Sequence, residues 1–377
     1  MIYFHIPFCK QACHYCDFHF STSLKYKEEM LAAMQQEIKM RAQYLDDKTV
    51  HSIYFGGGTP SILGAEEINR LIDGVAQHFE IASDAEITLE ANPDDLHSEK
   101  VKGLRNSPVN RFSIGIQSFF EEDLRWMNRA HNAAEAEASI KRVQDEGFEN
   151  ITCDLIYGYP LLSDVKWKAN MAQLIENHVP HISSYAMTVE QKTALSSMIN
   201  KGKTAPMNEE QSATQFELLM HTLQEHGYDH YEISNFAKPG HYAKHNSSYW
   251  RGKSYLGIGP SAHSFNGTSR SWNIANNALY IADIQKNELP LETEQLSLAD
   301  RFNEYVMTAL RTMWGIDLNK VQADFGSDLI YHIERETKGY LEANDIEKTE
   351  ANFLRLTRKG KLLADRIASD IFWVEEE

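Results

Sequence analysis

Strand-like and helix-like segments alternate through the first two thirds of the chain, and this alternation most limits the folds available. Strands separated by single helices become parallel neighbours through right-handed crossovers. We therefore predict an α/β fold, a partial or complete (β/α) barrel of about six βα units. The predicted strands are 1–6, 50–55, 86–91, 111–116, 151–156 and 182–185, with helices near 22–45, 64–79, 96–106, 120–128, 132–147 and 165–178.

The pattern changes after about residue 235. Loops rich in Gly, Asn and Ser, with isolated short strands, occupy 236–275. Later segments indicate helices over 298–312 and 318–326, an extended stretch at 353–357 and a final helix. We predict three parts: a barrel over 1–235, an extension over 236–290, and a small, mainly helical, winged-helix-like domain over 291–377. A Rossmann-type open sheet is the rival for the first part. It requires G-x-G-x-x-G, which the Gly56–Gly58 run does not fit.

Bulk composition narrows the classes of function. The chain has 377 residues, a hydrophobic fraction of 42% and a formal net charge of -17. Such acidity argues against nucleic-acid binding, which relies on clustered Lys and Arg. The sequence contains no basic leader and no apolar run of about 18 residues, so we expect no transmembrane segment and a cytoplasmic location.

Three cysteines lie close together near the start of the chain: Cys9, Cys13 and Cys16, spaced C-x3-C-x2-C. An iron–sulfur cube enclosed by protein usually takes four cysteines. Three thiolates would hold such a cluster and leave one iron open to a small molecule. The alternatives are an inert buried trio or a zinc site, although zinc sites usually combine two C-x2-C-like pairs. A zinc site would need one of three nearby histidines: His5, His14 or His19.

Polar or glycine residues follow several predicted strands. Because the carboxyl ends of barrel strands form the catalytic face, we expect these residues to surround the cysteine loop. Arg129 and His131 are predicted on the helix after Gln117, where Arg129 alone would be read as a solvated residue. Asp154 lies in an apolar run, where an unpaired carboxylate costs several kcal/mol, whereas Cys153 is read as a small buried hydrophobe. The other strand-end residues are Tyr3, His5, Gly56, Gly57, Gly58 and Glu90.

Several segments together resemble the radical S-adenosylmethionine superfamily. Within it, they are similar to the branch that contains oxygen-independent coproporphyrinogen III dehydrogenase and a group of heme chaperones. The resemblance covers essentially the whole chain. It rests on the C-x3-C-x2-C loop and on YFHIPFC (3–9), GGGTPS (56–61), TLEANP (88–93), SIGIQSF (113–119), RAH (129–131) and DLIYG (154–158).

The resemblance implies specific ligands. Cys9, Cys13 and Cys16 would bind a [4Fe–4S] cluster whose open iron chelates S-adenosylmethionine. An electron donor for the cluster would be a partner, and the sequence leaves a homodimer open. Residues that the resemblance assigns to S-adenosylmethionine are Tyr3, Gly57, Gly58, Thr59, Glu90, Gln117, Arg129 and Asp154, with the backbone around Tyr15 and Ala186.

Two departures separate the chain from the dehydrogenase. Phe18 stands at the position where that enzyme carries a fourth cysteine. The two residues before Tyr3 leave no room for the N-terminal extension of that enzyme. Conversely, 245–250 matches the H-N-x-x-Y-W signature of the heme chaperones. The resemblance therefore implies heme as cargo and apo-hemoproteins as recipients, with the dehydrogenase as the alternative and another radical enzyme as a third possibility. Candidate heme-binding residues are His245, Tyr249 and Trp250, although a packed loop in which His245 only forms hydrogen bonds is the plainer interpretation.

Overall fold

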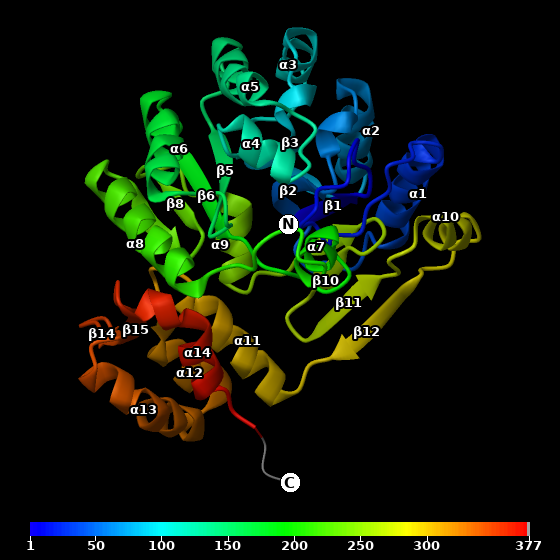
Figure 1. The fold of residues 1–377 in the computed structure, drawn as a ribbon. Helices are drawn as coiled ribbons and strands as arrows, with labels where there is room; N and C mark the ends of the chain where they lie inside the picture. The colour runs from blue at the N-terminus through cyan, green and yellow to red at the C-terminus, as the bar shows by residue number, and fades with distance from the viewer. Residues whose placement is uncertain (375–377) are drawn as a thin grey trace.

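The computed structural model describes residues 1–374, and a single large sheet forms its centre (Figure 1). Six strands follow one another in chain order as parallel neighbours: β1 (Ile2–Ile6), β2 (Thr49–Gly57), β3 (Glu80–Ala91), β4 (Arg111–Gln117), β5 (Ile151–Tyr157) and β6 (His181–Ala186). These strands confirm the predicted α/β fold with six parallel units.

Three short strands extend the sheet at its two sides. β9 (Leu256–Ile258) pairs parallel to β1. On the other side, β8 (Asn235–Ala237) pairs antiparallel to β6, and β7 (Asp229–Glu232) pairs antiparallel to β8. The order is therefore β7-β8-β6-β5-β4-β3-β2-β1-β9, with β7 and β9 at opposite ends of the described sheet. The barrel is partial rather than closed.

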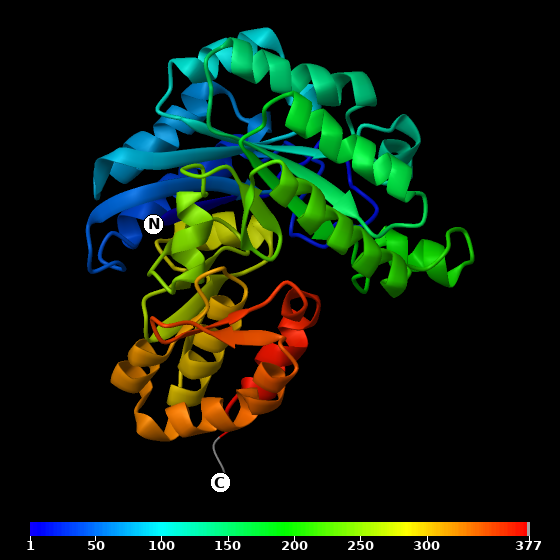
Figure 2. The same cartoon turned by 90° about the vertical axis from the view of Figure 1, so that its left-hand side faces the viewer.

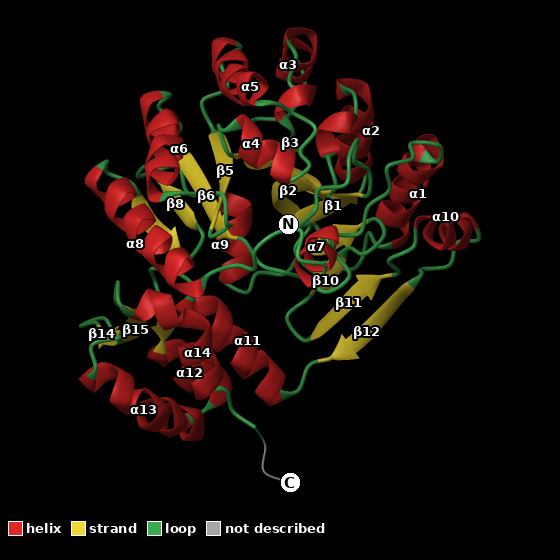
Figure 3. Cartoon of the chain, in the orientation of Figure 1, coloured by secondary structure: helices red, strands yellow, loops and turns green. Residues whose placement is uncertain are grey.

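Helices cover the outer face of this sheet, as the secondary-structure colouring shows (Figure 3). Every residue of β4 is buried, because helices pack on one face and loops and side chains cover the other. Asn132 illustrates how local sequence starts a helix. Its side chain accepts a hydrogen bond from the backbone N–H of Glu135, and the Glu135 carboxylate accepts one from the backbone N–H of Asn132. The covering helices are α1 (Lys27–Met40), α2 (Ala65–Ala76), α3 (Ser98–Arg105), α4 (Glu121–Trp126), α5 (Ala133–Asp145), α6 (Asp164–Glu176) and α8 (Glu209–Glu225).

One sequence-based expectation was wrong in this region, and another was incomplete. Arg129 and His131 do not lie on a helix: α4 ends at Trp126, Asn128 takes a left-handed φ of 57°, and α5 begins at Ala133. The segment 236–275 contains short strands, as expected, among them β10 (His263–Phe265) and β11 (Ser269–Asn273), but it also contains the helix α9 (Lys244–Trp250). The chain continues into α10 (Asn277–Gln285) and β12 (Leu291–Gln295).

A buried polar network fixes this extension to α1. The Glu37 carboxylate accepts hydrogen bonds from the Tyr280 hydroxyl at 2.5 Å and from Asn273 Nδ2 at 2.7 Å. It also forms an ion pair with Arg41, whose Nη1 lies 3.3 Å from Glu37 Oε1. Glu37 also accepts from the backbone N–H of Gly259 at 2.8 Å. Because every charge in this network has a partner, it can lie buried and hold the turn after β9 in one position.

The C-terminal part has a hydrophobic core of its own, built from side chains between Phe302 and Ile371. It lies beside the barrel as a separate layer of helices and a small antiparallel sheet (Figure 2). This arrangement confirms a helical C-terminal part, while the domain boundaries remain predictions. Its elements are α11 (Leu298–Leu310), β13 (Ile316–Asp317), α12 (Leu318–Phe325), α13 (Ser327–Glu342), β14 (Ile346–Lys348), β15 (Phe353–Leu356) and α14 (Ala364–Ile371). Within residues 1–374, no helix combines the length and the apolar character needed to cross a bilayer.

Candidate functional site

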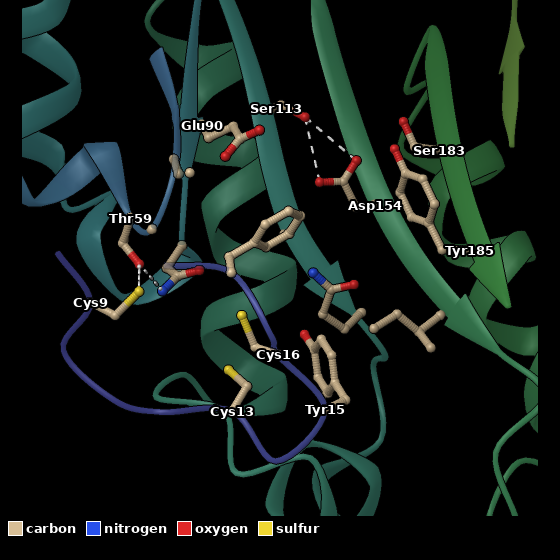
Figure 4. A pocket seen from close by; sticks show the side chains of 18 of the residues that line it. Cys9, Cys13, Tyr15, Cys16, Thr59, Glu90, Ser113, Asp154, Ser183 and Tyr185 are labelled. Atoms are coloured by element: carbon tan, nitrogen blue, oxygen red, sulfur yellow. Dashed lines mark hydrogen bonds between the residues drawn. The ribbon is translucent and has the colours of Figure 1, made fainter. Parts of the chain in front are cut away.

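A cavity of about 470 Å³ opens at the carboxyl ends of the parallel strands. The close-up shows the three cysteines on their loop at one side, with Glu90, Asp154 and Tyr185 on the strands at the other (Figure 4). The sequence-predicted residues that line this cavity are Cys9, Cys13, Cys16, Tyr15, Gly57, Gly58, Thr59, Glu90, Gln117, Arg129, Asp154 and Ala186. Tyr3 lines a neighbouring cavity instead.

The cysteine loop is held by its own backbone and by the turn after α4. The N–H of Cys9 donates to the carbonyl of Ser21 at 3.0 Å, and the N–H of His14 donates to the carbonyl of Met127 at 3.0 Å. Two donors face the sulfurs: Thr59 Oγ1 lies 3.5 Å from Cys9 Sγ, and Arg129 Nη1 lies 3.4 Å from Cys13 Sγ. These donors would stabilise thiolates bound to iron.

All four cysteines in the chain are free thiols. Burial raises the pKa of Cys9, and it raises the pKa of Cys16 to about 11. Without metal these two thiols therefore stay protonated at neutral pH, and binding iron would release their protons. Three free thiols around one cavity fit a [4Fe–4S] cluster, in which each cysteine binds a different iron.

The zinc alternative finds no support in the ligand geometry. His5 Nε2 lies 2.9 Å from the His19 carbonyl, His14 Nδ1 lies 2.8 Å from the Trp126 carbonyl, and His19 Nε2 lies 2.7 Å from Asn277 Oδ1. None of the three histidines lines the cavity with the cysteines. In residues 1–374, no group of three or more His, Cys, Asp or Glu side chains is gathered around a point that one metal ion could occupy.

The glycine run lets the end of β2 touch the start of the cysteine loop. The N–H of Gly58 donates to the carbonyl of Ile6 at 2.9 Å, and the N–H of Thr59 donates to the carbonyl of Phe8 at 2.6 Å. A Cβ on Gly58 would lie 2.6 Å from the Phe8 oxygen and 2.7 Å from the Ile6 oxygen. Gly57 has a φ of 100°, which other residues rarely adopt.

Two carboxylates line the cavity from the strands on either side of β4: Glu90 on β3 and Asp154 on β5. Burial raises the pKa of Glu90 to about 7, with a further contribution from the charge of Asp154, although the Tyr54 hydroxyl donates to Glu90 at 2.8 Å. Burial raises the pKa of Asp154 to about 6, against the hydrogen bond from Ser183. Carboxylates with raised pKa values gain most from a cationic or hydroxyl-bearing ligand.

Arg129 is not a solvated side chain. Its Nη2 donates to Asn92 Oδ1 at 2.7 Å and to the carbonyl of Gly115 at 3.0 Å, while Nη1 lies 3.3 Å from the Tyr15 hydroxyl. Gln117, at the end of β4, takes a left-handed φ of 64°. Backbone strain of this kind in a residue other than glycine is concentrated at functional sites.

A second cavity of about 810 Å³ adjoins the first. His245, Tyr249 and Trp250 line it from α9, together with Tyr3, His5 and Tyr255. The two cavities adjoin along a common wall, because they share five lining residues: Phe18, Tyr54, Glu90, Tyr185 and Asn246.

His245 is held in place within the second cavity. Its Nδ1 lies 2.9 Å from Ser52 Oγ, and its backbone N–H donates to Glu86 Oε1 at 3.0 Å. Burial lowers the pKa of His245 to about 3, so the imidazole is neutral at pH 7. Its Nε2 forms no hydrogen bond with any residue in the described part of the chain. A neutral, oriented imidazole with one open nitrogen is the form that binds a metal.

Comparison with known proteins agrees with this geometry. The radical SAM superfamily model matches residues 3–173. The chain is 34% identical over 371 residues to "Heme chaperone HemW" of Mycobacterium tuberculosis, covering 97% of this chain and 93% of that protein. The Bacillus subtilis protein of the same name is 34% identical over 370 residues, covering 97% of each. The chain belongs to the HemW family of radical SAM proteins.

The HemW-family chain also shares its fold with a solved enzyme. Coproporphyrinogen III oxidase (HemN) from Escherichia coli, described as a radical SAM enzyme, superposes with a TM-score of 0.85. The alignment covers 98% of this chain and 89% of that one at 23% sequence identity. At this identity the likeness establishes the fold alone.

Several residues that line the cavities of this HemW-family chain were missed in the sequence. Ser183 and Tyr185 lie on one face of β6, and Ser183 pairs with Asp154 across β5 and β6. The strand alternation around 182–185 was a usable signal, because residues two apart point to the same face. Arg111 carried the same signal, because it lies two residues before Ser113 on β4, and both line the first cavity. Asn92 and Asn246 carried none, because their positions depend on a turn and on the packing of α9.

Proposed function

We propose that this chain is a heme chaperone that uses a [4Fe–4S] cluster and S-adenosylmethionine and delivers heme to apo-hemoproteins. The observation that carries the proposal is that two cavities adjoin, one bordered by three free thiols and the other by His245 and aromatic side chains. Membership of the HemW family supports it, because the named relatives are heme chaperones.

In the first cavity, Cys9, Cys13 and Cys16 would hold the cluster. When bound, the cluster would offer an open iron to S-adenosylmethionine and supply one electron to it. Glu90 and Asp154 would accept hydrogen bonds from ammonium or hydroxyl groups, and their raised pKa values favour a ligand that carries positive charge. An electron donor for the cluster belongs to the proposal as a partner.

In the second cavity, the residues match a flat, largely apolar macrocycle that contains iron. His245 presents a neutral imidazole, and the rings of Tyr249 and Trp250 meet edge to face with centroids 5.2 Å apart. Tyr249 is 41% exposed, which leaves its ring free to stack on a ligand. Tyr3 borders this cavity, so a contact with S-adenosylmethionine would have to reach it from the shared wall.

We place the protein in the cytoplasm, where thiols remain reduced and available to iron. A homodimer remains part of the proposal to be tested by the mass of the protein in solution.

A hemin titration followed in the Soret band tests heme binding. Saturable binding of one hemin per chain is expected, and His245→Ala should shift the Soret maximum and weaken binding roughly tenfold. His221→Ala is the matched control, because His221 lies on α8 with its side chain 56% exposed and contacts Glu225. Absence of saturable hemin binding to the unchanged protein would contradict the proposal.

A second assay separates the chaperone from the dehydrogenase. The anaerobically reconstituted protein is given coproporphyrinogen III, S-adenosylmethionine and a reductant, and protoporphyrinogen is measured. We expect no turnover at catalytic rates. Catalytic conversion would make the protein an oxidative decarboxylase rather than a chaperone.

A further inference from the structure

Two arginine side chains, which stay positively charged at neutral pH, line the second cavity. Within the described chain, Arg270 and Arg311 are the only Lys or Arg residues that line it, and neither lines the first cavity. Arg270 lies on β11, and Arg311 caps the C-terminus of α11. The C-terminal part of the chain therefore contributes directly to this cavity.

Acidic side chains position both guanidinium groups without covering them. Arg270 Nη2 lies 2.7 Å from Glu304 Oε1, and the Arg270 side chain remains 31% exposed. Arg311 Nη1 lies 2.8 Å from Asp365 Oδ1 and Arg311 Nε lies 3.5 Å from Glu232 Oε1, with the Arg311 side chain 25% exposed. Glu304 lies on α11, and Arg311 follows that helix directly, so one helix sets the place of both cations.

The two cations border the aromatic surface of the cavity. The Arg311 guanidinium lies 5.5 Å from the centroid of the Trp250 ring. Arg270 pairs with Phe265 across β10 and β11, and His263 pairs with Trp272 two positions further along. A flat ligand against Trp250 would therefore have its edge close to a fixed positive charge.

We propose that Arg270 and Arg311 bind the carboxylate side chains of the tetrapyrrole and so set the orientation of the ligand. The inference rests on the proposed heme-binding function. A planar guanidinium matches a carboxylate through two parallel hydrogen bonds. Glu90 and Glu232 also line this cavity, and Arg311 already offsets the charge of Glu232, whose Oε1 lies 3.5 Å from Arg311 Nε. The carboxylates would then point away from the cysteine loop.

The first arm of the test changes the ligand and leaves the protein intact. Hemin and hemin dimethyl ester have the same macrocycle and iron, but the ester carries no free carboxylate. We expect the unchanged protein to bind hemin roughly tenfold more tightly than the ester at low ionic strength. Added salt should reduce this difference, because both arginines are partly exposed.

The second arm changes the protein. The double variant Arg270→Met, Arg311→Met should weaken hemin binding roughly tenfold and leave ester binding within about twofold, so that the preference for hemin disappears. Arg251→Met is the matched control: Arg251 is exposed and packs over Trp314 at 4.1 Å, outside the cavity lining. Arg270→Lys, Arg311→Lys should restore part of the preference, because charge returns without the planar fork.

The outcomes distinguish the two proposals. Equal affinity of the unchanged protein for hemin and ester, or a preference that survives in the double variant, overturns the role of the arginines and leaves heme binding intact. Absence of saturable binding of either ligand overturns the proposed function itself. Because the ligand arm needs no variant, a folding defect in the double variant cannot imitate either result.

Discussion

Phe18 shows how much one position can say before and after the structure. The sequence indicates only that Phe18 replaces the fourth cysteine of the similar dehydrogenase. The structure adds that Phe18 is 66% exposed and borders both cavities. An apolar ring therefore stands between the candidate cluster space and the candidate heme space.

At the residue scale, the cysteine assignment makes a direct prediction. Cys16→Ala should lower the iron and sulfide bound per chain after anaerobic reconstitution to a small fraction of the parent value, because two thiolates cannot replace three. Cys153→Ala is the matched control, since Cys153 is buried on β5 and outside the cavity lining. Equal loss in both variants would count against the assignment.

Glu90 predicts a pH-dependent stability. Its pKa is raised from 4.5 to about 7, so the folded ligand-free protein favours the protonated form. The contribution of Glu90 to stability is therefore fully present below pH 4.5 and is lost as the pH rises through 7. Glu90→Gln should increase the free energy of unfolding by about 2 kcal/mol at pH 8 and by little at pH 5.

Denaturant unfolding at both pH values measures this difference. Glu66→Gln, at an exposed position of α2, is the control and should change stability little at either pH. A Glu90→Gln effect that is the same at pH 5 and pH 8 would show that ionisation of this carboxyl is not its cause.

At the element scale, the contact between β2 and the cysteine loop depends on Gly58. Gly58→Ala should destabilise the protein by about 2 kcal/mol or more and reduce cluster occupancy, because the new Cβ would press on two backbone carbonyls. Gly74→Ala on α2 is the matched control. Its Cβ would lie 3.5 Å from Ile38 Cδ1, an ordinary contact, and alanine favours the helix.

Thermal unfolding and iron content together measure the Gly58 effect. A stable Gly58→Ala protein with full iron content would show that the backbone in this region yields easily.

The elements that the sequence predicted are those in which apolar residues recur at regular helix or strand spacing. The six parallel strands and the six helices between them agree with the prediction, because each strand has a buried stretch and the helices have an apolar face. The start of β3 was missed, because its first five residues, Glu80–Asp84, are not buried. The helices α8 and α13 were missed. Gln215 is buried in α8, where it accepts from the Gly158 N–H, and Thr337 is buried in α13, so polar residues interrupt the apolar pattern.

The helix α9 was missed for a different reason. It spans seven residues, Lys244–Trp250, and contains Asn and Ser residues with low helix propensity. Its start is fixed by contacts from far along the chain, since Glu86 accepts from the N–H groups of Lys244 and His245. Local sequence cannot reveal such a helix, and it therefore predicts a loop for the candidate residues.

At the scale of the whole molecule, Lys361 lies at the junction between the C-terminal part and the barrel. Its ammonium donates to the carbonyl of His230 at 3.3 Å. Burial lowers its pKa from 10.5 to about 8, with help from the positive charge of Arg355. The folded state therefore favours the neutral amine, and the contribution of Lys361 to stability is present above pH 10.5 and is lost as the pH falls through 8.

Lys361→Met should accordingly stabilise the protein by about 1 kcal/mol at pH 7, and the gain should shrink towards pH 10. Lys338→Met is the control, because Lys338 is exposed on α13. Denaturant unfolding across this pH range measures both variants. A gain at pH 10 as large as that at pH 7 would rule out relief of the buried charge as the cause.

The incomplete barrel has one further consequence. In a closed barrel, the bore follows from the number of strands and their stagger, and it can change only by adding or removing a strand. Here the described sheet ends in β7 on one side and β9 on the other, and these two strands do not join. Its curvature can therefore widen or tighten with every interstrand hydrogen bond intact. The width available to a bound ligand is then set by the side chains that line the two cavities and not by the strand count.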